Sequence, residues 1–102
     1  MNSIVCPGAF FGEKSFYRSK DGAHYFNFEF CPRSDGTIDV YCNDHPSLNG
    51  RSSDPHKTHL FSSGKICFTA GKQPRSMARA EQLAGQWAEY FLEYRRTGIA
   101  QR

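Results

Sequence analysis

The sequence predicts an α+β domain, in which an antiparallel β-meander of about four strands carries a C-terminal α-helix packed across one face. Three observations lead to this fold class. Residues 23–31 and 37–43 alternate between apolar and polar side chains, as half-buried strands do. The five residues between them, Pro-Arg-Ser-Asp-Gly, have the composition of a turn. The last quarter of the chain instead repeats its apolar residues at helical spacing.

The two alternating segments form the predicted central hairpin. An earlier strand near Phe16–Ser19 is expected to pair with the first of them through a turn at residues 20–22. Since side chains alternate across a strand, each segment presents one apolar face. The residues expected to share that face are Phe26, Phe28, Phe30, Ile38, Val40 and Cys42.

Residues 44–58 break the alternation, because they contain two prolines, one glycine and many polar turn-formers. A loop of this length is uncommon in a compact domain unless it has a function. Residues 64–69 then predict a short fourth strand. Ile66 and Phe68 share one face of it, which places Cys67 on the opposite face.

The C-terminal segment predicts the helix most clearly. Ser76 is a suitable N-cap, and Gly98 stands where a left-handed glycine ends many helices. Between them, apolar residues recur every three or four positions, and we expect the large aromatic ones to pack against the sheet. The stripe consists of Met77, Ala80, Ala84, Trp87, Phe91 and Tyr94.

Length and charge limit the function classes. A chain of 102 residues predicts one domain spanning 1–102. Its formal net charge of +3 is too small to indicate nucleic-acid binding. No apolar stretch reaches the length of a membrane span, and the N-terminus has no signal-peptide pattern. We therefore expect a cytoplasmic protein without a membrane or nucleic-acid partner.

The spacing of the cysteines does not favour a metal site. Structural zinc ligands usually come in close pairs, and the sequence has no Cys-x-x-Cys. Only His56 and His59 lie close together among the histidines. We therefore predict no metal and no cofactor. A disulfide is not expected in a reducing cytosol, so each cysteine is predicted to be either a small core residue or a reactive thiol. The four cysteines are Cys6, Cys31, Cys42 and Cys67.

Cys67 is the candidate nucleophile. It follows a turn and precedes a glycine-containing loop at residues 70–75, so it is expected at the rim of the sheet, partly exposed. His59, Lys65 and Lys72 lie near it in the sequence. Positive charge near a thiol favours the thiolate, which is the nucleophilic form. From the residues alone, a plain structural thiol remains the alternative.

The stretch from His59 to Gly98 resembles the short bacterial ubiquitin-conjugating-enzyme-like proteins of anti-phage operons. The resemblance lies in HLFSSGKICF, SMARA and WAEYFLEYRRTG, and it covers about 40 residues. In that family a G-x-[IL]-C cysteine precedes a tryptophan-bearing helix that ends in Y-x-x-[TS]-G. The resemblance implies a reduced ubiquitin-conjugating-enzyme-like fold.

The resemblance also implies an activity. Cys67 would accept a protein C-terminus as a thioester and pass it to an amine. The implied partner is a ubiquitin-like protein, or a cyclic-oligonucleotide synthase whose C-terminus is conjugated. His59 matches the family histidine, whose role would be structural or, through its ring, that of an oxyanion donor. Larger relatives have His-Pro-Asn at this point, whereas this chain has Leu60 and Phe61 after the histidine. The oxyanion donor is therefore unassigned.

Two other classes of function stay open. A non-catalytic protein-interaction module on the same fold is the main alternative, and the absence of the proline and the asparagine favours it. A small zinc-binding or nucleic-acid-binding protein is the third. Trapping of an adduct on Cys67 distinguishes the transferase from the other two.

Overall fold

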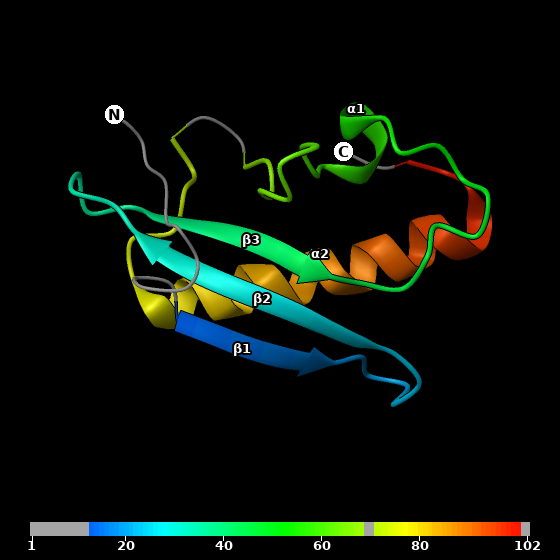
Figure 1. The fold of residues 1–102 in the computed structure, drawn as a ribbon, viewed down its shortest axis with the longest axis horizontal. Helices are drawn as coiled ribbons and strands as arrows, with labels where there is room; N and C mark the ends of the chain where they lie inside the picture. Colours follow the sequence, from blue (N-terminus) through cyan, green and yellow to red (C-terminus); the bar gives the residue numbers. More distant parts are fainter. Residues whose placement is uncertain (1–12, 69–70, 101–102) are drawn as a thin grey trace.

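The computed structural model describes residues 13–68 and 71–100, and its strands form one antiparallel sheet in the order β1-β2-β3 (Figure 1). The strands are β1 (Glu13–Arg18), β2 (Tyr25–Pro32) and β3 (Ile38–Asp44). A long helix, α2 (Met77–Thr97), lies across one face of this sheet. The predicted α+β class is therefore confirmed, with three strands in the described residues.

The central hairpin has the predicted pairing and the predicted buried face. In the register of β2 with β3, Phe30 lies opposite Val40 and Phe28 opposite Cys42. All six residues expected on this face are buried, and they form one cluster with Ile66 and the inner side of α2. The first strand begins and ends earlier than predicted. Ser19 belongs to the turn, where its N–H donates to the carbonyl of His24 (2.9 Å).

Helix α2 begins and ends where the sequence predicts. The Ser76 hydroxyl accepts a hydrogen bond from the N–H of Arg79, and Gly98 adopts the left-handed conformation (φ 76°). Trp87 and Phe91 meet the Phe26 ring edge-on, with ring centroids 5.9 and 5.8 Å apart. Three alanines of α2 are also fully buried, which brings the helix close to the sheet: Ala80, Ala84 and Ala88.

The predicted fourth strand is present only as a fragment. Of residues 64–69, the part that pairs with β3 runs from Gly64 to Ile66, while residue 69 lies outside the described residues. The Cys42 N–H donates to the Gly64 carbonyl (2.7 Å), and the Ile66 N–H donates to the Val40 carbonyl (2.8 Å). Gly64 lies at the end of a turn and has φ 93°, which is not a strand conformation. Regular pairing of this segment with β3 is therefore limited to a few residues.

The loop after β3 contains a four-residue helix, α1 (Pro55–Thr58). Tyr94 is buried, and its hydroxyl donates to the Ser52 carbonyl of this loop (2.8 Å). It does not belong to the core cluster that joins α2 to the sheet. In the part of the chain that the structure describes, no helix has the length and apolar content of a membrane span.

Candidate functional site

Cys67 lies on a short hairpin beside β3, formed by residues 59–67 and called here the Cys67 hairpin. The N–H of Cys67 donates to the His59 carbonyl (2.8 Å), and the N–H of Phe61 donates to the Lys65 carbonyl (2.9 Å). Ile66 is buried, while its neighbour Cys67 is exposed, as the predicted alternation requires. The main chain at Cys67 is thus fixed on one side by the hairpin while the residue stays open to solvent.

A cleft of about 340 Å³ adjoins Cys67. Its walls come from the β2–β3 turn, the Cys67 hairpin and the segment that leads to α2. The cleft, called here the Cys67 cleft, is lined by Arg33, Asp35, Thr37, Asp39, Phe61, Lys65, Ile66, Cys67, Phe68 and Gln73.

Two cations and two carboxylates form a network in the Cys67 cleft. Arg33 Nε lies 3.9 Å from the carboxylate of Asp35. Arg33 lies 3.0 Å and Lys65 3.5 Å from the carboxylate of Asp39, whose side chain is only 11% exposed. The hydrogen bond from Arg33 to Asp39, with their attraction, raises the pKa of the guanidinium. Lys65 was expected to favour the thiolate, but its ammonium is partly neutralised by Asp39. Lys72 is exposed in the following loop.

Of the other two described cysteines, Cys31 is disulfide-bonded, contrary to the expectation from the sequence. Cys42 is a free thiol, and its environment is the opposite of that of Cys67. It lies on the buried face of β3 and is 4% exposed, and burial raises its pKa to about 12. Its Sγ contacts the carbonyl oxygen of Asp44 at 3.4 Å. Since the thiolate is the nucleophile, Cys42 is unreactive near neutral pH, whereas Cys67 is accessible.

His59 connects α1 to the Cys67 hairpin. It has a left-handed backbone (φ 57°) at the end of α1, and its N–H donates to the Pro55 carbonyl (2.8 Å). Its ring packs against Tyr90 of α2, with ring centroids 5.2 Å apart. The structure therefore brings the main chain of His59, through its carbonyl, into contact with Cys67. These contacts fit a structural role for His59.

Side chains of α2 hold the main chain of the preceding loop. The indole N–H of Trp87 donates to the Thr58 carbonyl (2.9 Å), the Tyr90 hydroxyl to the Lys57 carbonyl, and the Tyr94 hydroxyl to the Ser52 carbonyl. A fourth bond joins Arg95 Nε to the Ser47 carbonyl (2.7 Å). This loop clamp, made of Trp87, Tyr90, Tyr94 and Arg95, lies on one side of the helix. It fixes a segment that contributes little to the core.

The loop clamp is a feature of the site region that the apolar pattern of the sequence does not reveal. The aromatic stripe of α2 was interpreted as apolar core alone. A signal was present, because two of its aromatic residues, Trp87 and Tyr94, carry a polar atom at the ring edge, and such rings usually find a hydrogen-bond partner when buried.

Arg51 strengthens the same arrangement from the loop side. Its guanidinium donates to the carbonyls of Arg95 (3.1 Å) and Arg96 (3.0 Å), which belong to the last turn of α2. A cation at a helix C-terminus is favourable, because the free carbonyls there carry partial negative charge. Hydrogen bonds thus run from side chains of α2 to carbonyls of the loop, and from the Arg51 side chain of the loop to carbonyls of α2.

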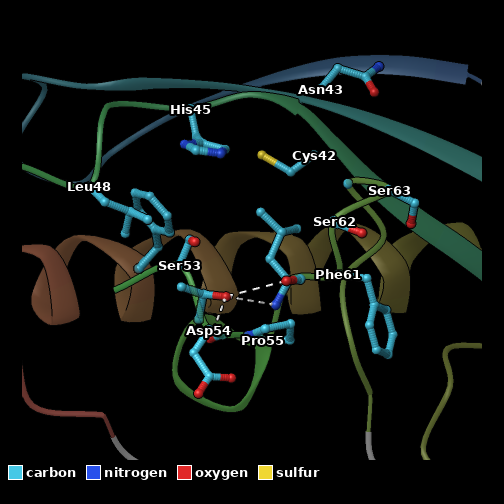
Figure 2. A pocket seen from close by; sticks show the side chains of 14 residues that line it. Cys42, Asn43, His45, Leu48, Ser53, Asp54, Pro55, Phe61, Ser62 and Ser63 are labelled. Carbon is cyan, nitrogen blue, oxygen red and sulfur yellow. Dashed lines mark hydrogen bonds between the residues drawn. The ribbon is translucent and has the colours of Figure 1, made fainter. Parts of the chain in front are cut away.

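A second cavity, of about 620 Å³, lies on the other side of the Cys67 hairpin, between β3, the loop and α2. Figure 2 shows Cys42 and His45 on one side of this cavity and Asp54 and Pro55 on the other. The His45 ring packs on Phe91 (4.7 Å between centroids). The cavity, called here the loop pocket, is lined by Cys42, Asn43, His45, Leu48, Ser53, Asp54, Pro55, Thr58, Leu60, Phe61, Ser62, Ser63, Gly64 and Phe91.

Within residues 13–68 and 71–100, no three His, Cys, Asp or Glu side chains gather closely enough to hold a metal ion. His56, the other half of the H-K-T-H pair, is exposed on α1. Comparisons with family models, with curated proteins and with solved structures find no match to this chain.

Proposed function

We propose that the protein is a cysteine-dependent acyl transferase of the ubiquitin-conjugating-enzyme type, with Cys67 as the acyl carrier. The observation that carries this proposal is the contrast between the two thiols. Cys67 is exposed beside a polar cleft on a chain held by main-chain hydrogen bonds, whereas Cys42 is only 4% exposed on the buried face of β3, where burial raises the pKa of its thiol. The resemblance of residues 59–98 to short bacterial conjugating-enzyme-like proteins supports the same assignment, as does the antiparallel sheet covered by a C-terminal helix.

The proposed reaction has two steps. The Cys67 thiolate attacks the carbonyl carbon of a thioester carried by a partner protein; a new C–S bond forms, and the partner's thiolate leaves with its electron pair. An amine then attacks the Cys67 thioester. An amide bond forms, the Cys67 thiolate departs, and the amine loses a proton to solvent. A thioester is more reactive toward an amine than an amide is, so one difficult exchange becomes two easier ones.

The charged groups of the Cys67 cleft give the acceptor a place to bind. Asp35 lies at its rim, and hydrogen bonds from the side chain and N–H of Thr37 lower the pKa of its carboxyl, so it stays ionised near neutral pH. Arg33 Nε lies 3.9 Å from this carboxylate, but both side chains are more than half exposed, so water screens the pair and the ammonium group of an incoming lysine can compete for Asp35. Asp39 forms ion pairs with Arg33 and Lys65 and so connects β3 to the Cys67 hairpin in the wall of the cleft.

The finer parts of the proposal rest on the resemblance. They are a reduced ubiquitin-conjugating-enzyme-like fold, with the 64–66 fragment as its fourth strand, a cytoplasmic location, and a role in anti-phage defence. The partner is then a ubiquitin-like protein, or a cyclic-oligonucleotide synthase that is conjugated through its C-terminus. His59 serves as a structural residue at the base of the Cys67 hairpin.

Adduct trapping in the native operon context tests the proposal. A Cys67→Ser variant should accumulate an oxygen ester with the partner, which alkali cleaves, and Cys67→Lys should accumulate a stable isopeptide. Cys42→Ser is the matched control and should retain the labile thioester on Cys67. If neither Cys67 variant captures a partner, and Cys67→Ala leaves function unchanged, the protein is a non-catalytic interaction module.

A further inference from the structure

We propose that the loop pocket binds an apolar side chain in the C-terminal tail of the acyl donor, a few residues before the carbonyl that reacts with Cys67. This inference rests on the proposed function and specifies its substrate class. It is carried by three observations: the lining of the pocket, the way its walls are held, and its position relative to Cys67.

The lining of the loop pocket does not favour a strongly charged occupant. Among the residues that the structure describes, no lysine or arginine lines it, and its one histidine, His45, has Nδ1 against the Pro46 carbonyl (2.7 Å) and its ring packed on Phe91. Phosphate groups and acidic side chains therefore find no lysine or arginine partner there. Its single carboxylate, Asp54, already caps α1 by accepting from the N–H of His56 (3.0 Å). The apolar wall is formed by Leu48, Leu60 and Phe91. A neutral, apolar group is therefore the best match.

Hydroxyl groups at the pocket suit the main chain of a peptide. Ser53, Ser62 and Ser63 are all exposed and line the cavity (Figure 2). Hydroxyl groups both donate and accept hydrogen bonds. An extended peptide can thus bury one side chain against the apolar wall while its amide and carbonyl groups bond to the rim, and the volume lies in the range of ligand sites.

The loop clamp makes the pocket preformed. The loop wall from Leu48 to Thr58 would be free to collapse if it depended on core contacts alone. Instead the carbonyls of Ser52 and Thr58 are held by Tyr94 and Trp87, at 2.8 and 2.9 Å. A preformed site loses less entropy on binding than one that must be ordered by its ligand.

Phe61 joins the loop pocket to the Cys67 cleft, because its side chain lines both. An extended chain advances about 3.3 Å per residue. A tail whose apolar residue occupies the loop pocket therefore needs only a few further residues to pass Phe61 and bring its terminal carbonyl to Cys67. The same hairpin then separates the specificity subsite from the reacting thiol.

Synthetic peptide thioesters test this inference without the natural partner. Each short peptide is built of glycine and serine, ends in an alkyl thioester, and carries either leucine or glutamate at one position, moved stepwise back from the carboxyl end. The rate of acyl transfer to Cys67 is followed by intact mass, with Cys67→Ala as the blank. At one position we expect leucine to be preferred over glutamate by about tenfold, the low end of the discrimination that apolar pockets provide.

Filling the pocket should remove that preference. Ser53→Phe is the filling variant, Ser62→Phe fills the same cavity from the Cys67 hairpin, and Ser47→Phe is the matched control, since Ser47 is an exposed residue of the same loop that does not line the pocket. Circular dichroism and thermal melting check the fold of each variant. We expect the leucine preference to disappear in the filled variants and to persist in Ser47→Phe.

The outcomes separate the two proposals. Equal rates for leucine and glutamate at every position, or a preference that survives filling, would overturn the pocket assignment while leaving Cys67 as the acyl carrier. If no peptide acylates Cys67 above the Cys67→Ala blank, the proposed function itself fails. Should both filled variants unfold, competition in the wild type by unreactive leucine and glutamate peptide amides decides: equal inhibition refutes the pocket.

Discussion

Removing the indole N–H of Trp87 tests how strongly α2 holds the loop that leads to Cys67. The N–H donates to the Thr58 carbonyl at 2.9 Å, and both residues are buried, at 6% and 2% exposure. Without this donor the carbonyl stays buried and unpaired. The sharpest substitution is 3-benzothienylalanine, which keeps the bicyclic shape of tryptophan and replaces the N–H with sulfur.

The expected loss follows from the burial of this bond. Leaving one buried acceptor unpaired costs about 1–3 kcal/mol, more than the net value of an exposed hydrogen bond. Trp87→Phe removes the same donor and also leaves a cavity beside Phe26 and Phe91, so it should cost more, roughly 2–4 kcal/mol in total. For a domain of this size, 1 kcal/mol lowers Tm by about 4–8 °C.

Urea unfolding, followed by far-ultraviolet circular dichroism, measures the effect. The midpoint should fall while the m-value stays constant, because the loop is lost with the rest of the domain. Tyr94→Phe is the control with an unchanged ring: its bond to Ser52 is only partly buried, so about 0.5–1.5 kcal/mol should be lost. A benzothienyl variant as stable as the wild type would refute the importance of the loop clamp.

Three further predictions concern other parts of the molecule. Iodoacetamide near pH 7 should alkylate Cys67 in the folded protein and Cys42 only after denaturation. Peptide mapping by mass spectrometry measures both reactions, and equal rates of modification would contradict the assigned burial of the two thiols. Gly98→Ala should destabilise the protein by about 1–2 kcal/mol in urea unfolding, because position 98 has φ 76° and a Cβ there would also displace the Arg51 guanidinium, 2.8 Å away. An unchanged midpoint would be incompatible with this cap. Burial and the hydrogen bond to Glu89 raise the pKa of Tyr17 from 10.0 to about 12; the neutral phenol is therefore favoured in the fold, so its contribution is complete below pH 10 and is lost as the pH rises toward 12. Tyr17→Phe should make stability less dependent on pH in that interval, and parallel pH profiles for the two proteins would argue against the assignment.

Most of the sheet and helix could be predicted from side-chain periodicity. The alternation around Phe28 and Val40 specified both the pairing and the buried face, because a shift of one residue would turn every apolar side chain toward solvent. The caps at Ser76 and Gly98 gave the ends of α2. The fourth strand was predicted over residues 64–69, but only Gly64 to Ile66 pair with β3. Periodicity shows which side chains share a face, but not how many residues find a partner strand.

The surroundings of Cys67 could be predicted only in part. Its exposure followed from the alternation with Ile66, and its position at the sheet rim followed from the adjacent turn. The pairing of Lys65 with Asp39 did not, because the two residues are far apart in the sequence and meet only once β3 is paired. The loop clamp was also hidden, since its acceptors are main-chain carbonyls, which every residue possesses.

The two cavities share the Cys67 hairpin as their common wall, which has a consequence for how the site is held. Ile66 anchors the hairpin in the core, while Leu60 and Phe61 line the loop pocket and Cys67 faces the cleft. A thiol on a regular strand of the sheet would be as rigid, but its neighbours would be fixed by sheet pairing and would leave little room for a substrate tail. Holding the loop by hydrogen bonds from α2 provides the same rigidity and leaves space on both sides of the hairpin. The polar atoms of Trp87 and Tyr94 therefore hold the loop beside the candidate site, while the Trp87 ring also packs in the core.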